Sequence, residues 1–264
     1  MSDDSVVHAL SRRRFLQMGG ALVAVLPAAC LTDPDDTDSQ AERVHLTARP
    51  GAVAQPLPPG KHPLGLGLGR DGFIYVPEDH VIGQPLPLMV LLHGATGRAW
   101  NWDSAIPLAD ELGMALMAPD ARGATWDVVR GSYGPDVAFI DAALETTFSH
   151  VQVDPARLAL AGFSDGASYT LGLGLGNGDL FTHLVAWSPG FMPLAAQRGQ
   201  PQIFVSHGTQ DQILSVQITR GQIVPELEAA GYSVTYEEFE GIHEIPREVA
   251  VQAMEWVAGV EVAS

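Results

Sequence analysis

The 264-residue chain is poor in cysteine, in lysine and in positive charge as a whole. Its one cysteine, Cys30, precludes an intramolecular disulfide and excludes a cysteine-rich zinc site. Its one lysine is Lys61. The chain has 14 basic and 31 acidic side chains, which gives a net charge of −17. Nucleic acids are bound by clustered basic side chains, so this composition argues against a nucleic-acid partner.

The apolar stretch at residues 18–26 is shorter than the roughly twenty residues that a membrane-spanning helix needs. It follows Arg12, Arg13 and Arg14 and precedes a group of small residues. A basic segment, a short apolar segment and small residues in this order are typical of a signal peptide. We therefore predict that residues 1–30 are a twin-arginine export signal. The protein would then be periplasmic, anchored to a membrane as a lipoprotein, or extracellular.

Cys30 has two interpretations that the sequence leaves open. It follows Ala28 and Ala29, as in a lipoprotein processing site, although Pro27 stands where an aliphatic residue is usual. A lipid on Cys30 would anchor the protein to a membrane without spanning it; otherwise Cys30 is lost with the signal. Residues 31–60 are acidic and then rich in proline, which predicts a flexible tether.

Residues 61–264 are expected to form one domain, because short apolar runs alternate there with amphipathic stretches of helical length. This alternation indicates βαβ units, and hence a doubly wound, mostly parallel sheet with helices on both faces. The predicted strands lie at 73–76, 86–92, 114–118, 157–162, 183–187, 202–206 and 232–239. The predicted helices lie at 102–113, 136–151, 165–175, 216–230 and 246–257.

Residues 162–166 read Gly-Phe-Ser-Asp-Gly and fit the pattern G-x-S-x-G. They follow a predicted buried strand and open a predicted helix, which is the setting of a nucleophile elbow. A serine on so tight a turn takes strained backbone angles, and Gly162 and Gly166 let neighbouring segments approach closely. The alternative is a serine that only caps the helix. We interpret Ser164 as a nucleophile.

A nucleophilic serine needs a base, and the base needs an acid that orients it. His243 lies between the last predicted strand and the last helix, at the edge where parallel strands gather their functional groups. His93 and His207 are its rivals by position. Asp211 also follows a strand and completes the chain order Ser, Asp, His. Asp179, in a glycine-rich turn, is the alternative acid.

An anionic tetrahedral intermediate requires backbone N–H donors near the nucleophile. One donor is expected to be the N–H of Asp165, which directly follows Ser164 at a helix N-terminus. The second is expected from the small-residue loop at 93–97, which ends an early buried strand.

The motifs at 91–94, 162–166, 207–211 and 241–243 together resemble the phospholipase/carboxylesterase group of α/β-hydrolases. They also resemble polyhydroxyalkanoate depolymerase-type esterases. The resemblance covers residues 65–257, implies the α/β-hydrolase fold, and makes Ala95 the second oxyanion donor. Asp165 departs from the Gln or Ala usual in such enzymes, and its carboxylate could orient a substrate or disfavour anionic ones. A cap, if there is one, must be small, because only 47 residues separate Ser164 from Asp211.

These features predict a serine hydrolase that cleaves small-molecule or lipid-like carboxylic esters through an acyl-enzyme intermediate. A thioesterase, a peptidase or an acyltransferase could use the same triad, and a non-catalytic envelope lipoprotein could keep the fold for binding. The glycines at 67–72 match G-x-G-x-x-G but precede a strand, the reverse of a dinucleotide site. We expect no cofactor and no metal.

Overall fold

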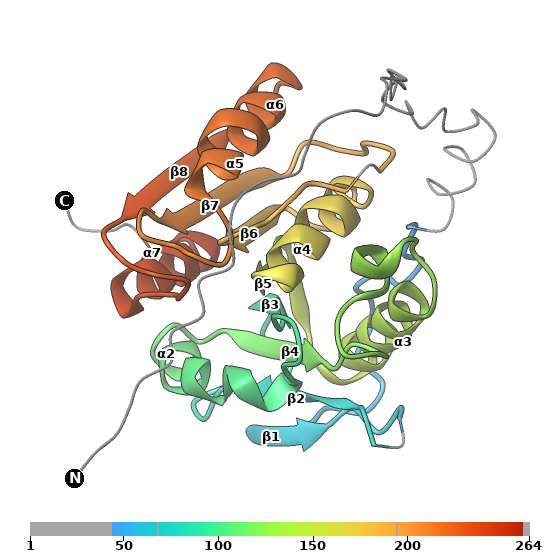
Figure 1. Ribbon diagram of the computed structural model, residues 1–264. Helices are drawn as coiled ribbons and strands as arrows, with labels where there is room; N and C mark the ends of the chain where they lie inside the picture. Colours follow the sequence, from blue (N-terminus) through green and yellow to red (C-terminus); the bar gives the residue numbers. More distant parts are fainter. Residues whose placement is uncertain (1–43, 68, 194, 261–264) are drawn as a thin grey trace, which may run out of the picture. The chain divides into compact units, whose positions relative to one another are not determined.

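The computed structural model describes residues 44–67, 69–193 and 195–260, and their centre is one eight-stranded sheet (Figure 1). The strand order is β1-β2-β4-β3-β5-β6-β7-β8; β1 and β2 run antiparallel to their neighbours and the remaining pairs are parallel. This confirms the predicted doubly wound, mostly parallel sheet. The strands are β1 Gly60–Pro63, β2 Gly72–Val76, β3 Leu86–Leu92, β4 Ala115–Pro119, β5 Val153–Phe163, β6 His183–Trp187, β7 Gln202–Gly208 and β8 Val234–Phe239.

The central strands are apolar along their whole length because both faces of the sheet are covered. All seven residues of β3 and all five of β6 are buried. Continuous burial is what parallel strands between two helical layers require, and it explains why apolar runs located these strands correctly. Both strands have the predicted bounds.

Helices pack on both faces of the sheet, as predicted. One apolar cluster joins the sheet to η1 (Ala99–Ala105), α2 (Ile106–Glu111) and α7 (Arg247–Ala258). The other cluster joins it to α3 (Pro135–His150), α4 (Asp165–Leu175) and α6 (Val224–Ala229). The single helix predicted at 216–230 is instead α5 (Val216–Ile218), a π-helical turn η3 (Thr219–Ile223) and α6. Pro225 has no N–H for the carbonyl of Gly221, so the regular pattern cannot continue there.

The prediction of a flexible tether over residues 31–60 is wrong for residues 44–60. Val44 and Leu46 are fully buried in the core on the α3–α4 side. The side-chain amide of Asn177 accepts from the N–H of Leu46 and donates to the carbonyl of Val44. Asp141 likewise accepts from two backbone N–H groups at 47 and 48. The backbone polar groups of this segment are thus hydrogen-bonded to side chains and not to a neighbouring strand. Composition alone could not reveal these partners. Residues 1–43, with the predicted signal and Cys30, lie outside the described residues.

The segment between β6 and β7 contains no helix within its described part, residues 188–193 and 195–201. This segment therefore forms no helical cap over the edge of the sheet, in agreement with the expected small cap. In the portion of the chain that the structure describes, no helix combines the length and the apolar character needed to cross a membrane.

Candidate active site

Ser164 stands on a strained turn between β5 and α4. Its backbone angles are φ 58° and ψ −120°, in a region that L-residues rarely adopt. A Cβ at Gly162 would lie 2.3 Å from the carbonyl oxygen of Gly166, and a Cβ at Gly166 would lie 2.2 Å from that of Leu92. The turn is therefore compatible only with glycine at both positions. The N–H of Ser164 donates to the carbonyl of Trp187 at 2.9 Å, which ties the turn to β6.

Adding one methyl group tests this steric requirement. We expect Gly166→Ala to lower the free energy of unfolding by about 3 kcal/mol, at the upper end of overpacking costs, because the opposing atoms are backbone. Gly221→Ala is the control, because nothing lies within 4 Å of a Cβ there; alanine at this helical position should be neutral or stabilise by up to about 1 kcal/mol. Urea unfolding measures both. Equal effects of the two substitutions would contradict the steric account.

The structure brings Ser164, His243 and Asp211 into one hydrogen-bonded chain. Nε2 of His243 lies 2.9 Å from Oγ of Ser164, and Nδ1 of His243 lies 2.6 Å from Oδ2 of Asp211. The three side chains come from the turns after β5, β8 and β7, which end at the same edge of the sheet. The ring of His243 also packs on Phe163, with centroids 4.7 Å apart.

The carboxylate of Asp211 is buried and held by several donors. Burial alone would raise the pKa of Asp211, but hydrogen bonds from the N–H of Leu214, from His243 and from the N–H of Ile213 outweigh it, so the pKa lies below its ordinary value. The carboxylate is therefore ionised at neutral pH and can only accept. Nδ1 of His243 consequently carries the hydrogen, and Nε2 is free to accept from the hydroxyl of Ser164.

The rival residues have other partners. In His93, Nε2 accepts from the N–H of Ala121, so Nδ1 donates to the carbonyl of Gly94, and no nitrogen is left to act as a base. His207 is fully buried and contacts the acid of the triad rather than Ser164. Asp179 pairs with Arg49 at 2.7 Å. Neither His93 nor Asp179 is part of the hydrogen-bonded series that begins at Ser164.

Ala95 lies in the loop after β3, and Asp165 directly follows Ser164. A Cβ at Gly94 would lie 3.3 Å from Cβ of Ser164, so the loop that carries Ala95 runs against the serine. Asp165 is the first residue of α4, where helical N–H groups have no intrahelical acceptor. Its carboxylate, which departs from the family pattern, accepts from the hydroxyl of Thr125 at 2.5 Å. Thr125 therefore fixes this charge beside the site.

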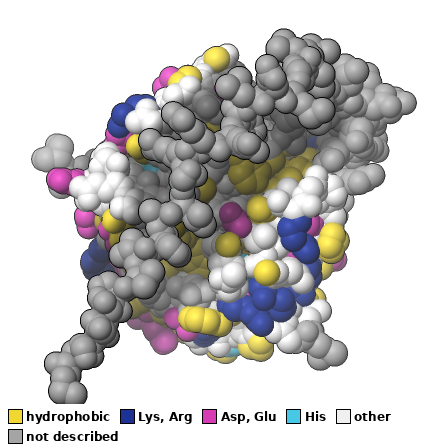
Figure 2. Space-filling model, viewed as in Figure 1, with side chains coloured by type: hydrophobic (Ala, Val, Ile, Leu, Met, Phe, Trp, Pro, Cys, Tyr) yellow, Lys and Arg dark blue, Asp and Glu magenta, His cyan; other side chains and the backbone are white. Residues whose placement is uncertain are grey.

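Sequence reasoning missed three arginines that bind the backbone or side chains at 97 and 120–121; of these, Arg70 contacts the loop that carries Ala95. Arg70 donates to the carbonyls of Gly97 and Ala121, and Arg98 pairs with the buried Asp120 at 3.0 Å. Arg122 donates to the carbonyl of Asp120. Figure 2 shows Lys and Arg side chains gathered at the lower right of the visible face. The partners are 20 or more residues apart in most of these contacts, so no local motif marks them.

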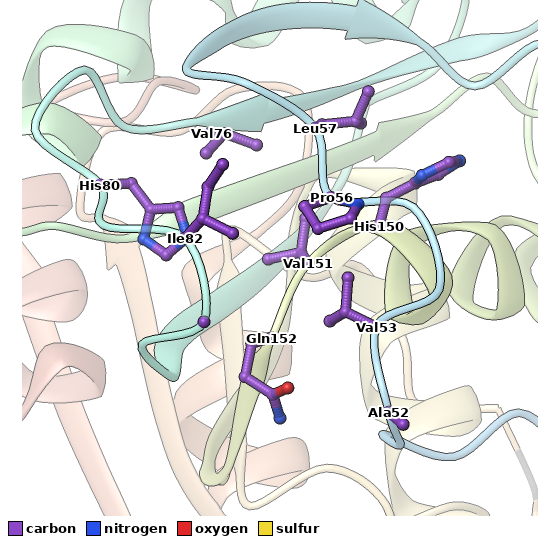
Figure 3. A pocket seen from close by; sticks show the side chains of 11 residues that line it. Ala52, Val53, Pro56, Leu57, Val76, His80, Ile82, His150, Val151 and Gln152 are labelled. Carbon is purple, nitrogen blue, oxygen red and sulfur yellow. The ribbon is translucent and has the colours of Figure 1, made fainter.

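An apolar cavity of about 300 Å³ lies between α2 and α7. Its walls include Trp102, Trp187 and Ile245, and Ile245 follows His243 by two residues. A separate pocket of about 260 Å³ is formed by the 52–57 segment, the turn at 80–83 and residues 150–152 (Figure 3). Gln152 precedes β5, whose other end leads into Ser164, so this second pocket lies at the opposite edge of the sheet.

Two buried histidines should make folding sensitive to acid. Burial lowers the pKa of His93 and of His183 below the ordinary value. The unfolded chain then binds more protons than the folded one, so stability is present above about pH 6.5 and is lost as the pH falls below it. We expect the free energy of unfolding to decrease from pH 7.5 to 5.5, and to decrease less in His183→Asn. Urea titrations at both pH values measure the slopes, and identical slopes would refute the role of His183.

Within the described ranges, no three His, Cys, Asp or Glu side chains come together in a way that could hold a metal ion. The expected absence of a metal and of a cofactor stays a prediction.

Comparison with known sequences gives a family and two curated relatives. The sequence profile of the Alpha/beta hydrolase family matches residues 89–256. Two curated relatives are a "Probable feruloyl esterase C" of Aspergillus niger, 27% identical over 181 residues, and a "Feruloyl esterase C" of Emericella nidulans, 29% identical over 181 residues. Each alignment covers 65% of this chain and 65% of the relative, so the chain matches just under two thirds of their length.

Comparison with solved structures shows the fold. An S-formylglutathione hydrolase of Staphylococcus aureus superposes with a TM-score of 0.63 at 17% identity, over 79% of this chain and 100% of that one. A ferulic acid esterase of Anaeromyces mucronatus, solved with ferulic acid, gives a TM-score of 0.54 at 18% identity, over 70% and 83% of the two chains.

Proposed function

The chain belongs to the alpha/beta hydrolase family, and we propose that it is a serine hydrolase that cleaves carboxylic esters. The observation that carries the proposal is the hydrogen-bonded chain from Ser164 through His243 to Asp211, with the serine on a strained turn. The esterase names of the curated relatives support the choice of bond. A serine that only capped the helix would not require hydrogen bonds to a histidine and, through it, to a carboxylate.

In the proposed first step, Oγ of Ser164 attacks the ester carbonyl carbon while Nε2 of His243 takes the hydroxyl proton. Asp211 stabilises the imidazolium and keeps Nδ1 as the donor. The N–H groups of Ala95 and Asp165 would hold the negative oxygen of the tetrahedral intermediate, a contribution of several kcal/mol in such sites. The carbon–oxygen bond to the alcohol then breaks, and the alcohol leaves with the proton from His243.

In the second step, water attacks the acyl group on Ser164 and gives its proton to Nε2 of His243. The bond to Oγ breaks, the carboxylic acid leaves, and Ser164 recovers the proton. Besides the ester and one water molecule, neither step needs a further reactant.

Fluorophosphonate labelling tests the proposal. The full chain is treated with the reagent and the adduct is located by mass spectrometry. We expect one adduct on Ser164 and its loss in His243→Ala, because the serine needs the base to react. Folded protein without an adduct would refute the proposal and favour a non-catalytic binding protein.

Ester hydrolysis can be distinguished from the other reactions that the same triad could catalyse. Exposed apolar side chains flank the site: Ile213 lies two residues after Asp211 and Ile242 directly precedes His243. Such side chains suit an apolar part of an ester. Turnover of 4-nitrophenyl acetate, 4-nitrophenyl butyrate and methyl ferulate is compared with that of an acyl thioester and a peptide. Preference for the thioester or the peptide would replace the ester assignment.

We also propose that the chain is exported through its twin-arginine signal at residues 1–30. Arg12, Arg13 and the apolar stretch at 18–26 support this proposal. Mass spectrometry of the mature N-terminus would find a lipid on Cys30 or a chain that begins after it. An N-terminus at Met1 in exported protein would contradict cleavage of the signal.

A further inference from the structure

A second imidazole contacts the carboxylate of Asp211. His207 lies in β7, one residue before the strand ends, and its side chain is fully buried. Its Nε2 is 3.2 Å from Oδ2 of Asp211, the same oxygen that accepts from Nδ1 of His243. One buried carboxylate oxygen therefore lies between two histidine side chains, and only His243 reaches Ser164.

The partners of His207 determine where its hydrogen lies. Nε2 is 3.0 Å from the carbonyl oxygen of Leu214, and a carbonyl only accepts, so Nε2 carries a hydrogen. Nδ1 lies 2.7 Å from the hydroxyl of Thr219. The ring is thus held at both nitrogens, with the N–H side turned toward the turn that begins at Asp211.

This turn is held from two directions. Inside it, Oδ1 of Asp211 accepts from the N–H groups of Ile213 and Leu214 at 2.8 and 2.9 Å. From outside it, the carbonyl of Leu214 accepts from His207. A displacement of His207 would release Leu214, and Leu214 in turn holds the carboxylate whose other oxygen orients His243.

We propose that His207 is a positioning residue for the triad: it fixes the 211–214 turn and directs Oδ2 of Asp211 toward Nδ1 of His243. The inference rests on the proposed function, because it concerns the acid of the same site. His207 does not touch Ser164 or a substrate. Its effect is expected in the chemical step rather than in substrate binding, because Asp211 acts on the protonation and orientation of His243.

Three variants of the full chain test the proposal. His207→Leu removes the N–H at similar volume, and His207→Gln can place an amide N–H near the position of Nε2. Ser206→Ala is the matched control, because Ser206 is buried on the same strand and its hydroxyl has no partner among the described residues. Circular dichroism and thermal unfolding establish that each variant folds.

We expect His207→Leu to lower kcat by roughly tenfold to a hundredfold with KM within about twofold, the scale of a small misplacement of a catalytic group. His207→Gln should recover most of the loss, and Ser206→Ala should match the wild type. An unchanged kcat in folded His207→Leu would overturn the proposal. So would a rise in KM alone, or equal losses in the Leu and Gln variants.

A spectroscopic measurement keeps this test separate from the esterase proposal. The Nδ1 proton of His243 is followed by NMR and assigned by its loss in His243→Ala. We expect its resonance to shift or broaden in His207→Leu and to stay in place in Ser206→Ala. Absence of ester turnover by the wild type would refute the proposed function but leave this measurement valid. An unchanged resonance in His207→Leu would refute the role of His207 whatever the enzyme hydrolyses. If His207→Leu does not fold, Thr219→Val takes its place, because it removes the hydroxyl that holds Nδ1 of His207. An unaltered resonance in Thr219→Val would then overturn the proposal.

Discussion

Replacing Ser164 by alanine is expected to reduce kcat/KM for 4-nitrophenyl acetate at least about ten-thousandfold, the scale seen when a nucleophile is removed from a triad that acts as a unit. Oγ of the Ser164 hydroxyl lies 2.9 Å from Nε2 of His243. Without it, no acyl-enzyme can form, and the remaining rate comes from the oxyanion donors and from water. Steady-state kinetics with an active-site titration measures the loss.

The fold should survive this change, because alanine keeps the Cβ and the turn already tolerates it at φ 58°. We expect the free energy of unfolding to change by less than about 1 kcal/mol. Ser188→Ala is a matched control: Ser188 also directly follows a strand of the sheet, is buried and has φ 54°, but its hydroxyl has no partner among the described residues. Activity retained in Ser164→Ala, or lost equally in Ser188→Ala, would exclude Ser164 as the nucleophile.

Local patterns located most of the candidate site. The residues at 162–166 determine their own turn, because the two glycines that it requires stand two positions before and two after the serine. Asp211 and His243 were found from their places at strand ends, since parallel strands bring those ends to one edge. The chain order then left few alternatives.

Contacts between distant parts of the chain could not be found in this way. The segment around Val44 and Leu46 looked like a tether because its composition is polar and proline-rich. It is ordered by Asp141 and Asn177, which lie more than 90 residues away. The role of His207 was hidden for a similar reason: its place at a strand end equally fits a catalytic base. Only the fold separates the two interpretations, because it puts His207 against Asp211 and His243 against Ser164.

Replacing Asp211 by asparagine is the most direct test of the acid, and we expect kcat to fall about ten-thousandfold, the loss known for the same change in another triad enzyme. The two backbone N–H groups of Ile213 and Leu214 require an acceptor at the position of Oδ1. The amide oxygen of asparagine must occupy this position, so its NH2 group takes the place of Oδ2. That NH2 donates to Nδ1 of His243 and leaves the hydrogen on Nε2, where it faces Ser164 and prevents proton removal.

The nearly equal size and shape of the two side chains should leave the fold intact, so the loss is expected in kcat and in the rate of fluorophosphonate labelling. Asp179→Asn is the control, because Asp179 pairs with Arg49 at a partly exposed position and was the alternative acid. It should retain full activity. If Asp211→Asn keeps activity within tenfold of the wild type, the imidazole of His243 does not depend on a charged partner. The serine would then be activated by a dyad, and the position of His207 beside Asp211 would serve the stability of the turn alone.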